Sequence, residues 1–146
     1  MATCTFFGHA DAPFTILPRL REAVVDLIEN QQVTDFYVGT HGAFDRAAYH
    51  VLKELASIYP TIRYTVVLSY HPAHSTALSE EEFKHSLLPA GIENVPPRFA
   101  IVWRNKWMLK QADHVITYVT HSWGGAAKFK GLAEKQGKHV VNLCIH

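Results

Sequence analysis

The stretch YVGTHGAFDRAAYHVL, residues 37–52, contains a corner whose residue types suit anion binding. Gly39, Thr40 and Gly42 follow an apolar run, and Asp45 comes three residues after the second glycine. Glycine lets the backbone turn sharply or approach a ligand closely, and the first amides of a helix attract phosphate. A carboxylate in the first helical turn is stabilised by the helix dipole. The corner therefore predicts either a phosphate cradle or a tight turn ordered by Asp45.

A second corner of the same kind occurs in SWGGAAKF, residues 122–129. Ser122 precedes the adjacent pair Gly124 and Gly125, and Ala126 begins a helical pattern. Adjacent glycines at a helix start expose a concave row of amides that suits a phosphate group. A flexible corner without a ligand is the alternative. Two such corners at strand ends of one sheet favour a shared anion site.

Further polar candidates lie near these corners. Gly8 and His9 end the first apolar run, while Arg104 and Asn105 lie in the helical stretch RNKWML. Arg104 can bind phosphate or carboxylate through two parallel hydrogen bonds, or it can belong to a solvated helix face. Five histidines follow predicted strands, namely His9, His41, His71, His74 and His121. No tight metal-ligand spacing joins them, so we expect hydrogen bonding to a ligand or loop, and no metal.

The elements that would position these residues alternate between strands and helices. The apolar patterns predict strands at 3–7, 34–39, 62–70, 114–120 and 139–145, and helices at 17–31, 43–57, 98–111 and 124–138. The segment 71–97 is less regular, with a short helix expected after Ser79 because Glu82 completes a capping box. Solid apolar strands alternating with helices indicate an α/β fold. We predict one domain, residues 1–146, with a Rossmann-like, doubly wound, mainly parallel sheet of about five strands and helices on both faces.

Composition excludes several classes of function. The formal net charge of the 146 residues is +1, with no block of like charges, so a nucleic-acid partner is not expected. No stretch approaches the length of a membrane span, and the N-terminus lacks a charged signal region, so a cytoplasmic protein is expected. G-x-S-x-G, Walker A and complete GxGxxG motifs are all missing from the sequence.

Four segments taken together resemble the SLOG superfamily, which includes DprA and the LONELY GUY phosphoribohydrolases, and most of all its small YpsA-like branch. They are CTFFGHADAP, YVGTHGAFDRAA, RNKWMLKQADHVITYV and GGAAKF, in this order. The resemblance implies a Rossmann-like domain that binds a nucleotide or nucleotide derivative, often as a homo-oligomer. Carried over by position, the family's binding residues are Gly8, His9, Gly39, Thr40, Gly42, Asp45, Arg104, Asn105, Gly124, Gly125 and Ala126.

Two departures from the family pattern bear on function. Ala10 stands where the family has an arginine, and SWGGAAKFKG offers lysines where the LONELY GUY branch has a catalytic glutamate. We therefore predict binding or sensing of a nucleotide-like ligand. One alternative is hydrolysis of a nucleotide N-glycosidic bond, with Asp45 or an acid from residues 80–82 supplying the carboxylate. A second is DprA-like handling of single-stranded DNA, through a lysine stripe formed by Lys128, Lys130, Lys135 and Lys138.

Overall fold

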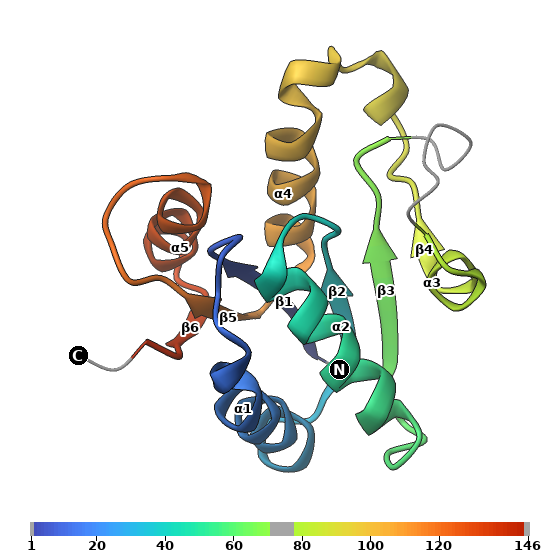
Figure 1. The fold of residues 1–146 in the computed structure, drawn as a ribbon, viewed down its shortest axis with the longest axis vertical. Coiled ribbons are helices and arrows are strands. Elements are labelled where there is room, and N and C mark those ends of the chain that lie inside the picture. The colour runs from blue at the N-terminus through green and yellow to red at the C-terminus, as the bar shows by residue number, and fades with distance from the viewer. Residues whose placement is uncertain (1, 71–77, 145–146) are drawn as a thin grey trace.

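The computed structural model describes residues 2–70 and 78–144, and its centre is a parallel β-sheet (Figure 1). The strands are β1 (Ala2–Gly8), β2 (Val33–Val38), β3 (Arg63–Val67), β4 (Ser86–Leu87), β5 (His114–Tyr118) and β6 (His139–Asn142). The helices are α1 (Leu17–Asn30), α2 (Ala43–Ala56), α3 (Glu80–Lys84), α4 (Ala100–Gln111) and α5 (Gly125–Lys135). Short 3-10 turns cover Phe14–Ile16, Ile92–Asn94 and Pro97–Phe99.

The strand order identifies where a ligand site is expected. The order is β4-β3-β2-β1-β5-β6, and every neighbouring pair is parallel. The chain builds outward from β1 to β4 and then returns to the other side of β1, where Gly8 pairs with Tyr118 of β5. The order therefore reverses between β1 and β5. In doubly wound sheets, ligands bind beyond the carboxyl ends of the strands at this reversal.

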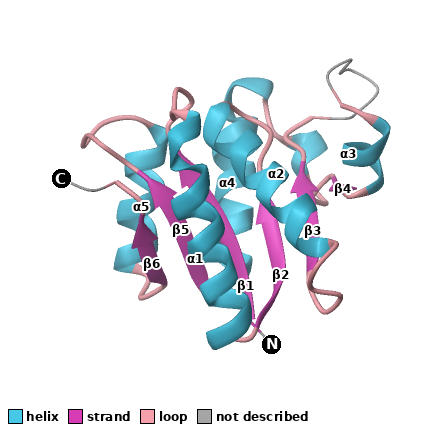
Figure 2. Cartoon of the chain, turned by 60° about the horizontal axis from the view of Figure 1, so that its bottom comes forward, coloured by secondary structure: helices cyan, strands magenta, loops and turns pink. Residues whose placement is uncertain are grey.

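Helices cover both faces of the sheet, as predicted. Figure 2 shows α1 and α2 on one face and α4 and α5 on the other. Neighbouring residues of β1 pack on opposite faces of the sheet, because side chains alternate along a strand. Phe6 belongs to the core beneath α1 and α2 with Phe36, whereas Phe7 packs with Phe129 and Met108 beneath α4 and α5. Both faces are thus buried, which explains the solid apolar strands.

The structure corrects the expected strand number and several boundaries. A sixth strand, β4, lies in the segment predicted to be irregular; with only two residues, it is too short to produce a periodic pattern. β3 ends at Val67 rather than at residue 70, and α4 begins at Ala100 after a 3-10 turn. The predicted cap of α3 is confirmed, since Ser79 Oγ accepts a 3.1 Å hydrogen bond from the Glu82 amide. Among the described residues, no helix has the length and apolar character needed to cross a bilayer.

Candidate ligand-binding site

A cavity of about 250 Å³ lies at the carboxyl end of β1, beside the loop that follows β5. This is the position that the reversal of strand order indicates. Elements from both faces of the sheet contribute to its wall. The lining residues are Phe6, Phe7, Gly8, His9, Ala10, His41, Asp45, Ile101, Arg104, Asn105, Gly125 and Ala126.

The cavity brings together most of the residues proposed from the sequence. Gly8, His9, Asp45, Arg104, Asn105, Gly125 and Ala126 all line it. The other candidates, Gly39, Thr40, Gly42, Ser122 and Gly124, are not among the lining residues. Gly39, Thr40 and Gly42 lie behind the cavity wall, in contact with Asp45, Arg104 or Ala10. Ser122 and Gly124 lie in the loop before α5.

Four other lining residues, Phe6, Phe7, Ala10 and Ile101, were not proposed as binding residues. Phe6 and Phe7 look like ordinary core positions of a strand, and Ile101 looks like part of an apolar helix face. Sequence periodicity does not indicate that a core residue also closes the end of a cavity. Ala10 stands where the pattern that the sequence resembles has an arginine, and His41 is one of the strand-end histidines expected to bond to a ligand or loop.

Asp45 orders the corner after β2, which is one of the two roles predicted for this corner. Its Oδ2 atom accepts a 2.9 Å hydrogen bond from the backbone N–H of His41. Burial raises the pKa of Asp45 to about 6, because loss of solvent outweighs the attraction of Arg104 and the His41 hydrogen bond. The side chain is only partly buried and lines the cavity. Asp45 is therefore a carboxyl group that titrates close to neutral pH.

Arg104 is a buried cation held in a fixed orientation. Its side chain is 1% exposed, and Nη1 donates to the carbonyl of Val67 at 2.8 Å and to Thr40 Oγ1 at 3.3 Å. Nε donates to Asn105 Oδ1 at 2.9 Å. Among the described residues, Nη2 has no acceptor. Burial lowers the pKa of Arg104, but a guanidinium keeps its charge in proteins, so the cavity wall contains a permanent cation.

Gly39 and Gly42 permit two close approaches behind the cavity wall. A Cβ at Gly39 would lie 2.7 Å from Asp45 Oδ2 and 3.1 Å from Arg104 Cζ, so both charged groups require glycine there. Gly42 has φ of +92°, and a Cβ on it would lie 2.5 Å from the Cα of Ala10. The N–H of Ala43 donates to the Ala10 carbonyl at 2.8 Å. The loops after β1 and β2 are thereby joined.

The two glycine corners differ in how much backbone they leave for a ligand. At the α2 corner, the amides of His41 and Ala43 already have acceptors in Asp45 and Ala10. The α5 corner has a similar cap geometry, with φ of +93° at Gly124, but a Cβ on Gly125 would meet no described atom within 4 Å. Among the described residues, the amides of Gly125 and Ala126 have no backbone acceptor, so the amino end of α5 is the better anion site of the two.

Three aromatic rings stack from the cavity wall outward. The rings of His9 and His121 lie 3.9 Å apart at 13°, and those of His121 and Trp123 lie 3.8 Å apart at 18°. His9 Nε2 accepts a 2.9 Å hydrogen bond from the Thr120 amide, so its proton resides on Nδ1. Burial and the neighbouring His121 both lower the pKa of His9. The stack therefore contains a neutral His9 at pH 7.

Asn142 braces the loop that carries this stack. Its Oδ1 atom accepts from the Val119 N–H at 3.0 Å and from Thr117 Oγ1 at 3.1 Å. Its Nδ2 atom donates to the Val119 carbonyl at 3.1 Å. One side chain on β6 thus pairs with both backbone groups of a residue just beyond β5.

The other charged candidates lie apart from the cavity lining. Ser79 caps α3 by accepting from the Glu82 amide, and Glu81 lies 3.7 Å from His85, so the acids of residues 80–82 belong to the α3 region beside β4. Lys130 pairs with Glu134 at 3.2 Å within α5. Among the described residues, no group of three or more His, Cys, Asp or Glu side chains is arranged to hold a metal ion. His71 and His74 lie outside the described residues.

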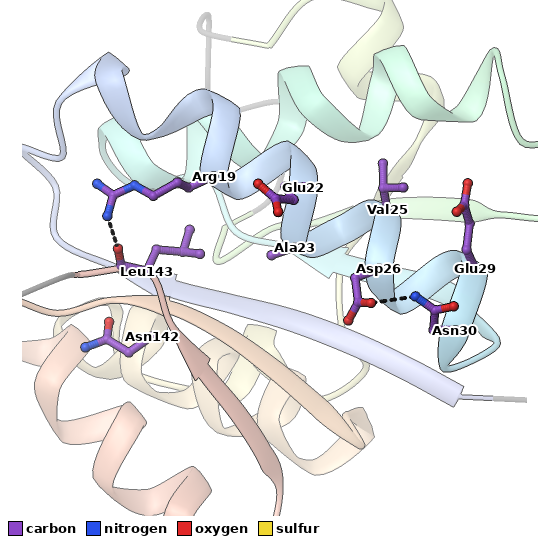
Figure 3. A pocket seen from close by; sticks show the side chains of 9 residues that line it. All are labelled: Arg19, Glu22, Ala23, Val25, Asp26, Glu29, Asn30, Asn142 and Leu143. Carbon is purple, nitrogen blue, oxygen red and sulfur yellow. Dashed lines mark hydrogen bonds between the residues drawn. The ribbon is translucent and has the colours of Figure 1, made fainter.

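A larger hollow, of about 590 Å³, lies along α1 beside the end of β6 (Figure 3). Its wall carries Glu22, Asp26 and Glu29, and its cation Arg19 donates to the Leu143 carbonyl at 2.7 Å. An excess of carboxylates repels a phosphate. We therefore do not assign the anion site to this hollow, despite its size.

Comparison with known proteins identifies the fold. No protein-family model matches this sequence, and no curated protein matches it. The structure is similar to the X-ray structure of DNA processing protein A (DprA) from Streptococcus pneumoniae, with a TM-score of 0.72 and 12% sequence identity. The similarity covers 97% of this chain and 50% of that chain, so this chain spans about half the length of DprA. The chain has a Rossmann-type α/β fold similar to that part of DprA.

Proposed function

We propose that this protein binds a phosphate-bearing nucleotide or nucleotide derivative in the cavity between β1 and α5. The observation that carries the proposal is the convergence of the open amino end of α5 with Asp45 and Arg104 on one cavity. A helix amino end attracts phosphate, and a buried arginine adds a fixed donor. Polar groups that converge on a concave site favour ligand binding over a purely structural role.

Each end of the cavity has a distinct role in this proposal. The amides of Gly125 and Ala126 hold the phosphate group. Arg104 Nη2 donates to a phosphate or sugar oxygen, and Asp45 accepts a hydrogen bond from a sugar hydroxyl through the oxygen that His41 does not use. The first corner orders the site, and the second supplies the phosphate contacts, which refines the expectation that both would cradle phosphate.

Substitution at Gly125 tests this proposal without disturbing the fold, because a side chain there has room. Nucleoside monophosphates should raise the melting temperature of the wild-type protein. Gly125→Glu should abolish that rise by repelling the phosphate, while the matched variant Gly125→Gln should keep part of it. An acid in the first turn suits a helix, so the unliganded Gly125→Glu variant should stay folded. No thermal shift with any of AMP, GMP, CMP or UMP would contradict the proposal.

Handling of single-stranded DNA is a second candidate. The near-neutral net charge predicted no nucleic-acid partner, but the similarity to a protein described as DNA processing favours one. Phosphates of a DNA strand would meet the same amino end of α5, next to the exposed Lys128. Retention of the protein on single-stranded DNA that weakens with added salt would support this function.

Cleavage of a nucleotide N-glycosidic bond is a third candidate, carried by Asp45. A carboxylate stabilises the positive charge that develops on the sugar as the base departs and water adds to the anomeric carbon. Asp45 is the one carboxyl group among the residues that line the cavity. Incubation with nucleoside monophosphates and chromatography for free base would distinguish turnover from binding.

A further inference from the structure

We infer that the exposed face of Trp123 is a stacking platform for the nucleobase of the ligand, just outside the phosphate-binding cavity. This inference rests on the proposed nucleotide binding. It adds which part of the ligand the protein recognises outside the cavity, and by which side chain.

The ring stack defines the orientation of the indole. His121 lies 3.8 Å from Trp123 and covers one face of it, and His9 in turn covers the other face of His121. His9 lines the cavity and is 8% exposed, whereas Trp123 is 69% exposed. The stack therefore begins in the cavity wall and ends in an indole face that no described residue covers. A planar ring placed there would be the fourth member of the stack.

The start of the loop that carries Trp123 is anchored by hydrogen bonds, and the ring stack on His121 orients the indole before a ligand arrives. His9 accepts a hydrogen bond from the Thr120 amide, and its own backbone N–H donates to the Tyr118 carbonyl at 3.1 Å. Asn142 holds both backbone groups of Val119. A rigid aromatic side chain loses little conformational entropy when a ligand binds to it.

A further polar atom points to a partner near the stack. Nδ1 of His121 is buried and has no hydrogen-bond partner among the described residues. Buried polar atoms normally have a partner, so an unpaired one marks a position that a ligand atom or water fills. His121 lies between the cavity residue His9 and the exposed Trp123, so this unpaired atom lies within the ring stack.

The separation of the two subsites fits a nucleotide. Trp123 precedes Gly125 by two residues, so their Cα atoms are at most about 7 Å apart. A base on the indole is therefore close to a phosphate on the amides of Gly125 and Ala126. Stacking of a base on an aromatic side chain contributes about 1–3 kcal/mol, which corresponds to roughly 5- to 150-fold in affinity.

Titration calorimetry with ligands that have or lack a base tests the inference. The wild-type protein should bind at least one of AMP, GMP, CMP and UMP more tightly than ribose 5-phosphate. Trp123→Ala should weaken binding of that nucleotide about 5- to 150-fold and change ribose 5-phosphate binding less than about two-fold. Trp123→Phe should keep most of the affinity. Phe83→Ala is the matched control, because Phe83 is also an exposed aromatic residue but lies on α3.

The outcomes separate this inference from the proposal beneath it. If the wild-type protein binds neither the nucleotides nor ribose 5-phosphate, nucleotide binding fails, and the stacking platform fails with it. If both ligand types bind and Trp123→Ala weakens them equally or not at all, nucleotide binding stands and the platform is wrong. If Trp123→Ala weakens binding of single-stranded DNA and leaves nucleotide binding intact, the indole serves a DNA base instead, and our assignment is overturned.

Discussion

Asp45 and Arg104 meet at one backbone atom, the Cα of Gly39, where an added Cβ would lie 2.7 Å from the carboxylate oxygen and 3.1 Å from the guanidinium carbon. The two side chains come from helices on opposite faces of the sheet, since α2 carries Asp45 and α4 carries Arg104. They meet beyond the end of β2. Charge attraction between them therefore connects the two helical layers at the edge where the cavity opens.

A double-mutant cycle should measure that attraction. Arg104→Met removes a buried cation and three hydrogen bonds, so we expect it to lower the free energy of unfolding by about 3–5 kcal/mol. Asp45→Asn should then stabilise the Arg104→Met variant more than it stabilises the wild type, by about 0.5–3 kcal/mol, because the unpaired carboxylate is removed. Urea unfolding of all four proteins gives the four free energies. Additive effects would show that the two groups do not interact.

The raised pKa of Asp45 predicts a defined pH dependence of stability. The carboxyl group titrates at about 6 in the folded protein and near 3.8 in the unfolded chain. Between these values the folded state binds more protons, so the free energy of unfolding falls as pH rises. A shift of about two pKa units corresponds to about 3 kcal/mol at most, and solvent in the cavity reduces it.

Asp45→Asn removes this titration. We therefore expect the stability of Asp45→Asn relative to the wild type to increase between pH 4 and pH 7, as measured by urea unfolding at both values. The same difference at both values would mean that Asp45 titrates normally.

Gly42 and Gly125 should respond oppositely to a single added methyl group. Gly42 has φ of +92° and touches Ala10, so Gly42→Ala should cost about 1–3 kcal/mol or more. Gly125 has open space around it, so Gly125→Ala should be neutral or stabilising by up to about 1 kcal/mol. Chemical denaturation of both variants checks this. Equal destabilisation would indicate that the two corners have the same packing.

For His9 we expect the opposite dependence of stability on pH from that of Asp45. Its pKa is lowered, so the folded state binds fewer protons than the unfolded chain just below pH 6.5, and this residue's contribution to stability falls as pH drops. Nitrogen-detected NMR should show His9 titrating below 6.5, with the proton of its neutral ring on Nδ1. A signal titrating at or above 6.5 would contradict the hydrogen bond from Thr120 to Nε2.

The long elements of the fold were predictable because their patterns are strong. β1 and β5 are mainly apolar runs, β2 ends in the apolar stretch 36–38, and α1 and α2 have clear helical periodicity. β4 was not predictable, since its pairing with Val66 and Val67 of β3 depends on tertiary contacts rather than on a local pattern. Parallel pairing between segments distant in sequence leaves little trace in either segment alone.

The location of the candidate site could be predicted from the sequence, but the contacts within it could not. Glycine at strand ends and the reversal of strand order indicate which loops converge. The sequence does not reveal that Gly39 is needed for the two charged side chains behind it, or that the amides of the α2 corner are already occupied. The His9–His121–Trp123 stack was missed for the same reason, because a histidine at a strand end does not reveal which ring it faces.

Asn142 links the outer strand of the sheet to the loop beside the cavity. Its side-chain amide bonds to both the N–H and the carbonyl of Val119, as the backbone of a neighbouring strand would if β6 were longer. A substitution of Asn142 would loosen Val119 and, through the neighbouring Thr120, the hydrogen bond to the cavity residue His9. In the proposed binding mode, a substitution on β6 therefore alters ligand preference although no residue of that strand is among those that line the cavity.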